Sequence, residues 1–282
     1  MKPITYHVPA TTANLGPGFD SLGLALSIGN RVTVSDSKTF PDDPFLMGAA
    51  EAFFSAARVH RQPFSVKIKG DVPSSRGLGS SVTVRLGLLL GLNERFGKPL
   101  PHDRLLHLVV RLEGHPDNVA PAALGGFCAC LPDRWLRTEV GEELYCIAAI
   151  PSVPMPTLEA RRVLPRQVKR TEAVANVQGT AYITAAFFSQ NYPALKSAFA
   201  DHLHQPFRAQ LLPGFDDALA AVEAIGALGG FLSGSGSTIM ALALERPKSV
   251  ARVLANSLRK AGHQDIRTLI LHADNTGARR ID

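Results

Sequence analysis

The segment PSSRGLGSS, residues 73–81, gives the first indication of how this chain folds. A strand-like alternation at 65–69 precedes it and an apolar run at 82–96 follows it, so the order is strand, glycine–serine loop and helix. Glycines let a backbone approach a phosphate closely, and serine hydroxyls and the free amides of a helix N-terminus add donors. The segment therefore indicates an anion-binding loop, with an ordinary serine-capped turn as the alternative. It is not a Walker A loop, because no Gly-Lys-Ser/Thr closes it.

Two more segments share this glycine-rich character. TTANLGPGFD at 11–20 offers two polar side chains, Asn14 and Asp20, and LSGSGST at 232–238 lies between two strand-like runs. Either segment alone is a weak signal, because turns use Gly, Asn and Asp for conformational reasons. Three such loops at the ends of apolar strands or helices favour one phosphate-rich ligand contacted from three sides.

A candidate metal ligand lies in the segment EGHPDNVAP at 113–121, which follows an amphipathic stripe over 105–112. Glu113 ends that predicted helix beside Gly114. Hard cations such as Mg²⁺ take oxygen ligands, so a carboxylate near a phosphate loop is a candidate magnesium ligand. An ordinary surface glutamate is the alternative.

The length of 282 residues is about that of two domains. We place the boundary in the proline-rich segment 151–156, which divides the chain into 1–152 and 153–282. Helix and strand patterns on both sides indicate an α+β protein. The apolar spacing predicts helices at 49–59, 82–96, 105–112, 168–178, 181–188, 192–203, 215–228 and 248–261, and strands at 31–34, 65–69, 125–131, 230–232, 238–242 and 268–271.

The composition argues against several classes of protein. Thirty basic and 24 acidic residues give a net charge of +6, but the densest basic run, 161–170, has no interleaved aromatic residues, so no nucleic-acid partner is expected. We expect no membrane span and no signal peptide, because no apolar run approaches roughly 20 residues. Three cysteines cannot build a disulfide framework, which fits a reducing cytoplasm. Cys128 and Cys130 alternate onto one strand face, where buried thiols are favoured over a zinc site.

The motifs taken together resemble the GHMP kinase superfamily, and within it the homoserine kinases. The resemblance rests on VPATTANLGPGFDSLGLAL (8–26), PSSRGLGSS (73–81), EGHPDNVAP (113–121) with LGG (124–126), TLEARRVLP (157–165), HQPFRAQLLPG (204–214) and LSGSGST (232–238). These segments span nearly the whole chain in the family's order. The second marks the superfamily, whereas the first and fourth are typical of homoserine kinases.

This resemblance implies an α+β, two-domain GHMP kinase fold. Its N-terminal domain would be like domain 2 of ribosomal protein S5, and its C-terminal domain would be ferredoxin-like. The implied reaction transfers a phosphoryl group from ATP to the side-chain hydroxyl of L-homoserine, in the cleft between the domains, as a step of threonine biosynthesis. A homodimer is left open, and no nucleic acid or membrane is an implied partner.

The resemblance also assigns residues to the site. The ATP phosphate loop would comprise Pro73, Ser74, Ser75, Arg76, Gly77, Leu78, Gly79, Ser80, Ser81, Val82 and Thr83. Ser81 or Ser80 would hold Mg²⁺ together with Glu113. Homoserine would be surrounded by Asn14, Asp20, His115, Arg161 and Arg208. Asn118 and Thr157, with Arg161, would act near the reacting hydroxyl. An amide at 118 cannot serve as a base, which leaves Asp20 as the rival candidate.

The chain departs from the family's usual pattern at three places. Val82 and Thr83 replace two small residues, Ser235 and Ser237 alter the last glycine loop, and Gly179 stands where an arginine is frequent. These departures bear on nucleotide fit and on the catalytic rate. Two alternatives therefore stay open, namely a GHMP kinase for another small alcohol such as mevalonate or threonine, and an ATP-binding regulator without turnover.

Overall fold

The computed structural model describes residues 2–282. Its first sheet has six strands in the order β10-β1-β2-β4-β5, with β3 also paired to β2. The strands are β1 (Ile4–Ala13), β2 (Leu22–Asp36), β3 (Phe64–Gly70), β4 (Phe127–Leu131), β5 (Arg134–Thr138) and β10 (Arg279–Arg280). The central strand β2 pairs with β1 along one edge, and with β4 and then β3 along the other. The sequence predicts only 31–34 of this 15-residue strand, because Gly23 and Gly29 interrupt its pattern.

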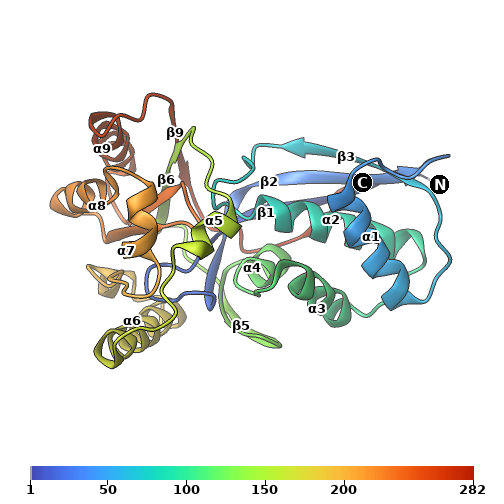
Figure 1. Ribbon diagram of the computed structural model, residues 1–282, viewed down its shortest axis with the longest axis horizontal. Helices are drawn as coiled ribbons and strands as arrows, with labels where there is room; N and C mark the ends of the chain where they lie inside the picture. Colours follow the sequence, from blue (N-terminus) through green and yellow to red (C-terminus); the bar gives the residue numbers. More distant parts are fainter. Residues whose placement is uncertain (1) are drawn as a thin grey trace.

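Four helices pack on this sheet, on the side below the strands in Figure 1. They are α1 (Pro44–Ala57), α2 (Ser80–Arg95), α3 (His102–Glu113) and α4 (Val119–Leu124). Helix α2 lies directly on β1 and β2. A Cβ atom on its Gly87 or Gly91 would stand 2.7 Å from Val32 or 2.5 Å from Val34, so these glycines permit the close approach. The approach fixes where the N-terminus of α2 stands relative to the ends of the strands.

A second, four-stranded antiparallel sheet has the order β7-β8-β6-β9. Its strands are β6 (Tyr145–Pro151), β7 (Gly229–Leu232), β8 (Ile239–Ala243) and β9 (Ile266–Leu271), and α8 (Phe215–Ala224) and α9 (Pro247–Lys260) pack on it. The succession β6-α8-β7-β8-α9-β9 in this strand order is the ferredoxin-like arrangement, which confirms the fold implied for the C-terminal half. Helices α5 (Thr157–Arg162), α6 (Arg170–Phe188) and α7 (Gln205–Arg208) lie between β6 and α8 in the chain, with 3-10 turns η1 (Tyr192–Leu195) and η2 (Ala209–Leu211).

Three of the predicted helices differ from the structure. The predicted helices 168–178 and 181–188 form one continuous helix, α6, whose Gly179 packs against Pro17. The predicted helix 192–203 is only the turn η1, because Ser197 adopts a left-handed φ of 57°. The Asp201 carboxylate then accepts hydrogen bonds from the backbone amides of residues 203, 204 and 205 and starts α7 instead.

Each predicted half of the chain contributes one strand to the sheet of the other half. Strand β6 ends at Pro151 yet belongs to the second sheet, and β10 returns from the end of the chain to pair with β1 in the first. The division at 152 stays a prediction.

The thiols of Cys128, Cys130 and Cys146 are free and buried, and burial raises the pKa of Cys128 to about 12. Among residues 2–282, no helix combines the length and apolar character needed to span a membrane.

Candidate active site

The three glycine-rich loops lie against one another between the two sheets. The Gly234 amide donates to the Ala13 carbonyl at 3.1 Å, and the Ser233 hydroxyl donates to the Gly77 carbonyl at 2.6 Å and lies 2.8 Å from the Thr12 hydroxyl. Beside them opens a cavity of about 440 Å³. Its lining includes Asn14, Asp20, Glu113, His115, Asn118, Thr157, Arg161, Arg208, Gly234 and Ser235. Together with residues of 73–81, all six motif segments are thus represented in one cavity.

The predicted phosphate loop forms one wall of this cavity. Ser75, Arg76, Gly77, Gly79, Ser80, Ser81 and Val82 line it. The other four residues of the predicted set, Pro73, Ser74, Leu78 and Thr83, do not. Leu78 belongs to the apolar core, and the Thr83 hydroxyl donates to the Ser80 carbonyl inside α2. The α2 N-terminus, which begins at Ser80, directs unpaired amides and a partial positive charge at this wall.

Glycine is required at two positions of the loop for a different physical reason from the close approach to a phosphate that the sequence suggests. Gly77 and Gly79 adopt left-handed φ values of 71° and 66°. A Cβ at Gly77 would overlap the Ser233 carbonyl, and one at Gly79 would overlap the Thr11 hydroxyl. Both glycines therefore serve the packing of the loop against its neighbours, and each Cβ would point into protein. Arg76 fixes the loop further, since its guanidinium donates to the carbonyls of Pro151 and Ser152.

The predicted metal ligands Ser81 and Glu113 are neighbours. The Ser81 hydroxyl donates to Oε2 of Glu113 at 2.9 Å, and Nη1 of Arg85 donates to Oε1 at 2.7 Å. The Glu113 side chain is only 7% exposed. Arg85 also lies over the Phe45 ring at 4.3 Å. The carboxylate is thus held between α2 and α3 with one oxygen on the loop side and the other on a cation.

His115, Asp117 and Asn118 form a hydrogen-bonded group at the start of α4. Nδ1 of His115 lies 2.6 Å from Oδ1 of Asp117, and the Asn118 amide donates to the same oxygen at 3.3 Å. Oδ1 of Asn118 accepts from the Thr11 hydroxyl at 2.7 Å. Both ends of the Asn118 amide are therefore engaged. Asp117 is buried and was absent from the predicted site, although it lies within the segment 113–121.

We expect the free energy of unfolding to fall as the pH rises, because His115 loses its proton. Burial alone would lower the pKa of His115, but its hydrogen bond to Asp117 and the charge of that residue outweigh burial and raise it. A raised folded-state pKa stabilises the fold fully below the unfolded value of about 6.5, and this contribution is lost as the pH rises through the folded value. Urea unfolding at pH 6 and 8.5 should show a larger decline for the parent than for His115→Gln. Equal declines would contradict the assignment.

Asp20 and Arg161 meet across the mouth of the cavity. Nη2 of Arg161 donates to both Asp20 oxygens, at 2.9 and 3.1 Å. Asp20 and Asn14 have left-handed φ values of 53° and 73°, a region that Asn and Asp tolerate better than most residues. The Asn14 amide donates to the Gly234 carbonyl and accepts from the Asp20 amide. Asn14 therefore lines the cavity, while its side chain mainly joins segment 11–20 to segment 232–238, which are the first and third glycine-rich loops in chain order.

Arg208 is the most deeply buried cation near the cavity. It is 2% exposed, and burial, followed by the charge of Arg161, lowers its pKa to about 10. Its guanidinium lies 5.2 Å from the centre of the Phe19 ring, and that of Arg161 lies 5.6 Å from the same ring. We did not predict this role of Phe19 from the sequence. The two arginines, 47 positions apart (208 − 161), share one aromatic platform.

Thr157 is the first residue of α5 and lines the cavity together with Leu158. The structure thus brings every predicted substrate and catalytic residue to the same cavity. Asp117, Phe19, Arg85 and Phe45 complete the arrangement and were missed. A carboxylate inside the segment 113–121 and an aromatic residue next to Asp20 were the available signals.

Comparison with known proteins shows the family. Residues 44–126 match the GHMP kinases N terminal domain, and residues 184–264 match the GHMP kinases C terminal domain. The chain is 38% identical to the homoserine kinase of Clostridium beijerinckii, covering 99% of both chains. The chain belongs to the homoserine kinases. It is also 40% identical to the homoserine kinase of Carboxydothermus hydrogenoformans, with 90% of each covered.

Solved structures agree with this placement in the homoserine kinase family. The homoserine kinase from Cytophaga hutchinsonii superposes with a TM-score of 0.87 at 26% identity, covering 100% of this chain and 98% of that one. The Methanococcus jannaschii mevalonate kinase, at 13% identity and a TM-score of 0.71, shares the fold over 96% of this chain. The predicted resemblance and the two-domain fold are confirmed. The chain is a GHMP-family phosphotransferase, and this family uses ATP.

Proposed function

We propose that the chain transfers the γ-phosphoryl group of ATP to the side-chain hydroxyl of L-homoserine, yielding O-phospho-L-homoserine for threonine biosynthesis. The observation that carries the proposal is the make-up of the cavity. The lining combines the glycine loop and the N-terminus of α2 with Arg161 and Arg208 and the carboxylates of Asp20 and Asp117. A triphosphate and a zwitterionic amino acid find complementary charges there.

The partly exposed pair Asp20–Arg161 suits the binding of an amino acid. The two side chains are 35% and 38% exposed, and such ion pairs contribute only about 0–1 kcal/mol. Ligand atoms of Asp20, His115 and Asp117 lie within 4.8 Å of one another. An ammonium group inserted among them gains acceptors, while the carboxylate of the same molecule takes over Arg161 and Arg208. The substrate thereby breaks an ion pair whose loss costs little free energy.

The residues around Glu113 fit a magnesium ion. The donors are a carboxylate and the hydroxyl of Ser81, both hard oxygen ligands, and they are already in contact at 2.9 Å. Mg²⁺ bound there would neutralise charge on the phosphate oxygens during transfer. Arg85 holds the second carboxylate oxygen and so orients the first toward the loop.

Glu113→Gln should raise the magnesium concentration needed for half-maximal activity by about 10- to 100-fold, since even outer partners of a metal site contribute that much. The amide keeps the shape but loses the charge. Calorimetric binding of a non-hydrolysable ATP analogue, with and without Mg²⁺, should show the same loss. The exposed Glu142→Gln is the control. An unchanged magnesium dependence would remove Glu113 from the metal site.

We expect no carboxylate to act as general base for the hydroxyl proton. Asn118 faces the cavity with an amide held by Thr11 and Asp117, and Asp20 is occupied by Arg161. Phosphoryl transfer has a loose transition state, so positioning and charge stabilisation can supply most of the rate. Asp20→Asn should therefore weaken homoserine binding more than it lowers kcat, with the exposed Asp42→Asn as control. An acidic limb of kcat that disappears in Asp20→Asn, with binding unchanged, would contradict this.

The proposal is tested by ADP release coupled to NADH oxidation over a panel of small alcohols. Homoserine should be turned over most efficiently, ahead of threonine and mevalonate. Preference for another alcohol would indicate a related GHMP kinase. Binding of ATP without ADP release on any alcohol would indicate a regulator, the alternative that Val82 and the altered third loop leave open. Val82 itself packs in the core formed by α1, α2 and α3.

A further inference from the structure

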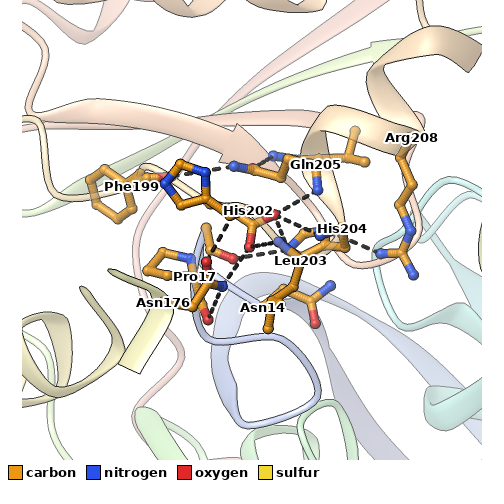
Figure 2. A network of polar contacts seen from close by, with 12 residues as sticks. Asn14, Pro17, Asn176, Phe199, His202, Leu203, His204, Gln205 and Arg208 are labelled. Carbon is orange, nitrogen blue, oxygen red and sulfur yellow. Dashed lines mark hydrogen bonds and ion pairs between the residues drawn. The ribbon is translucent and has the colours of Figure 1, made fainter. Parts of the chain in front are cut away.

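A buried polar network holds the segment 201–208 against the first glycine loop, and Figure 2 shows it from close by. The Asp201 carboxylate caps α7 and also accepts from the Asn176 amide at 2.7 Å. Asn176 in turn donates to the Pro17 carbonyl at 3.0 Å. Gln205 accepts from the Leu232 amide at 2.7 Å, next to the third glycine loop. The network therefore joins both halves of the chain behind the cavity.

His204 lies at the centre of this network with no exposed side-chain surface. Its Nδ1 is 3.3 Å from Nη1 of Arg208, and its Nε2 is 2.9 Å from the Gly16 carbonyl. The ring stacks on Phe19 with 5.1 Å between centroids. Arginine offers only donors, so Nδ1 must accept and the proton must lie on Nε2, where it is donated to Gly16. Both contacts fit the same neutral tautomer.

The surroundings of His204 favour this neutral form. Burial lowers the pKa of His204, the nearby Asp201 carboxylate opposes the shift, and the Arg208 charge reinforces it. Asp201 is itself engaged by Asn176 and by three backbone amides. Arg208 has no carboxylate within 4.0 Å among residues 2–282. No carboxylate of the described residues therefore forms a direct ion pair with Arg208.

The guanidinium of Arg208 is held by three contacts. Nε donates to the Ala160 carbonyl at 3.1 Å, and Nη1 donates to the Gly234 carbonyl at 2.9 Å as well as to His204. In the part of the chain that the structure describes, Nη2 has no such bond. A carboxylate in place of the imidazole would pair with Arg208 and compete with an incoming anion. A neutral acceptor orients the guanidinium and leaves its charge available.

We infer that His204 is a positioning residue that sets the Arg208 guanidinium for the carboxylate of the amino-acid substrate. This inference rests on the proposed function. It assigns His204 no contact with the substrate. The two ring nitrogens have different roles. Nδ1 orients Arg208 for the substrate, whereas Nε2 attaches segment 201–208 to the first glycine loop.

The test compares two variants that each keep one half of the ring's hydrogen bonding. In His204→Gln the new amide reaches the position of Nε2, whereas His204→Asn places an oxygen near Nδ1. The readout is the ratio of kcat/KM for homoserine to that for 3-aminobutan-1-ol, which has a methyl group instead of the carboxylate. His204→Gln should reduce this ratio by at least about tenfold, as expected for a lost bond to a charged group. His204→Asn should keep it within about threefold of the parent's, since the acceptor for Arg208 remains.

Controls separate positioning from general damage. The KM for ATP should stay unchanged in both variants, and the exposed His202→Gln, two residues away, should match the parent throughout. If His204→Gln does not fold, His204→Ala replaces it, because alanine and asparagine both lose the Gly16 bond and only asparagine keeps an acceptor for Arg208. Equal ratios in the asparagine variant and its comparison variant would overturn the inference. A parent that releases no ADP on homoserine would instead overturn the proposed function, and the inference with it.

Discussion

Replacing Arg208 by lysine should raise the KM for homoserine by about 10- to 150-fold, the range for loss of a charge-assisted hydrogen bond. Lysine keeps the charge but presents a single ammonium group in place of a planar fork. It cannot maintain the contacts with Ala160, Gly234 and His204 and also meet a carboxylate from two directions. Steady-state kinetics with homoserine varied at saturating ATP measure the effect.

The KM for ATP of Arg208→Lys should change little, since the phosphates are assigned to the glycine loop and the α2 N-terminus, whereas Arg208 belongs to α7. The exposed Arg162→Lys is the matched control from the same basic run. The parent should use 3-aminobutan-1-ol poorly, because that alcohol lacks the group the arginines bind. Equal efficiency with homoserine and this alcohol, or an Arg208→Lys variant that behaves as the parent, would remove the arginine pair from substrate binding. Either result would favour a kinase for another alcohol.

Gly77→Ala should destabilise the protein by at least about 3 kcal/mol, at the upper end of what single substitutions do. Two effects combine. A residue with a side chain in the left-handed region costs roughly 1–2 kcal/mol, and the new Cβ would overlap the Ser233 carbonyl of the third loop. That carbonyl belongs to the strand end that the Ser233 hydroxyl ties to Gly77. Urea unfolding of the two proteins gives the difference in free energy.

Gly97→Ala is the control that separates the two effects. Gly97 has a similar φ of 76°, but a Cβ there would meet no atom within 4 Å. It should therefore cost only the roughly 1–2 kcal/mol of the backbone term. Folded Gly77→Ala should also bind an ATP analogue more weakly, since the loop must move away from the third loop. Equal stability losses at both positions would show that contact between the two loops contributes little.

Local patterns were sufficient to predict much of the site. Glycine–serine segments next to apolar runs indicated a phosphate loop, and helix α2 begins at Ser80, two residues before the predicted start. The stripe over 105–112 forms α3, and Glu113 ends it near Ser81. These features depend on residues close together in the chain, where hydrogen bonding and side-chain periodicity determine the conformation.

Other features depend on contacts between distant residues, and local patterns misjudged them. The segment 192–203 has helical apolar spacing, yet it forms only the turn η1, and its Asp201 accepts from Asn176 and caps α7, which carries Arg208. Gly79 reads as an approach to phosphate, whereas its missing Cβ makes room for Thr11. In both cases a buried polar group found a partner far away in the chain, which outweighs a local preference.

Motifs and periodicity were enough to establish the family, the order of the glycine loops and the chemical types of the site residues, because they are properties of neighbouring positions. Only the folded arrangement decided which of these residues face one cavity and which ion pairs, ring contacts and protonation states they adopt. It paired Asp20 with Arg161, placed both arginines on Phe19, and left Arg208 without a carboxylate beside a neutral His204. Burial and long-range hydrogen bonds set those states, and both arise only when distant segments come into contact, as Asn14 and Gly234 do across 220 positions.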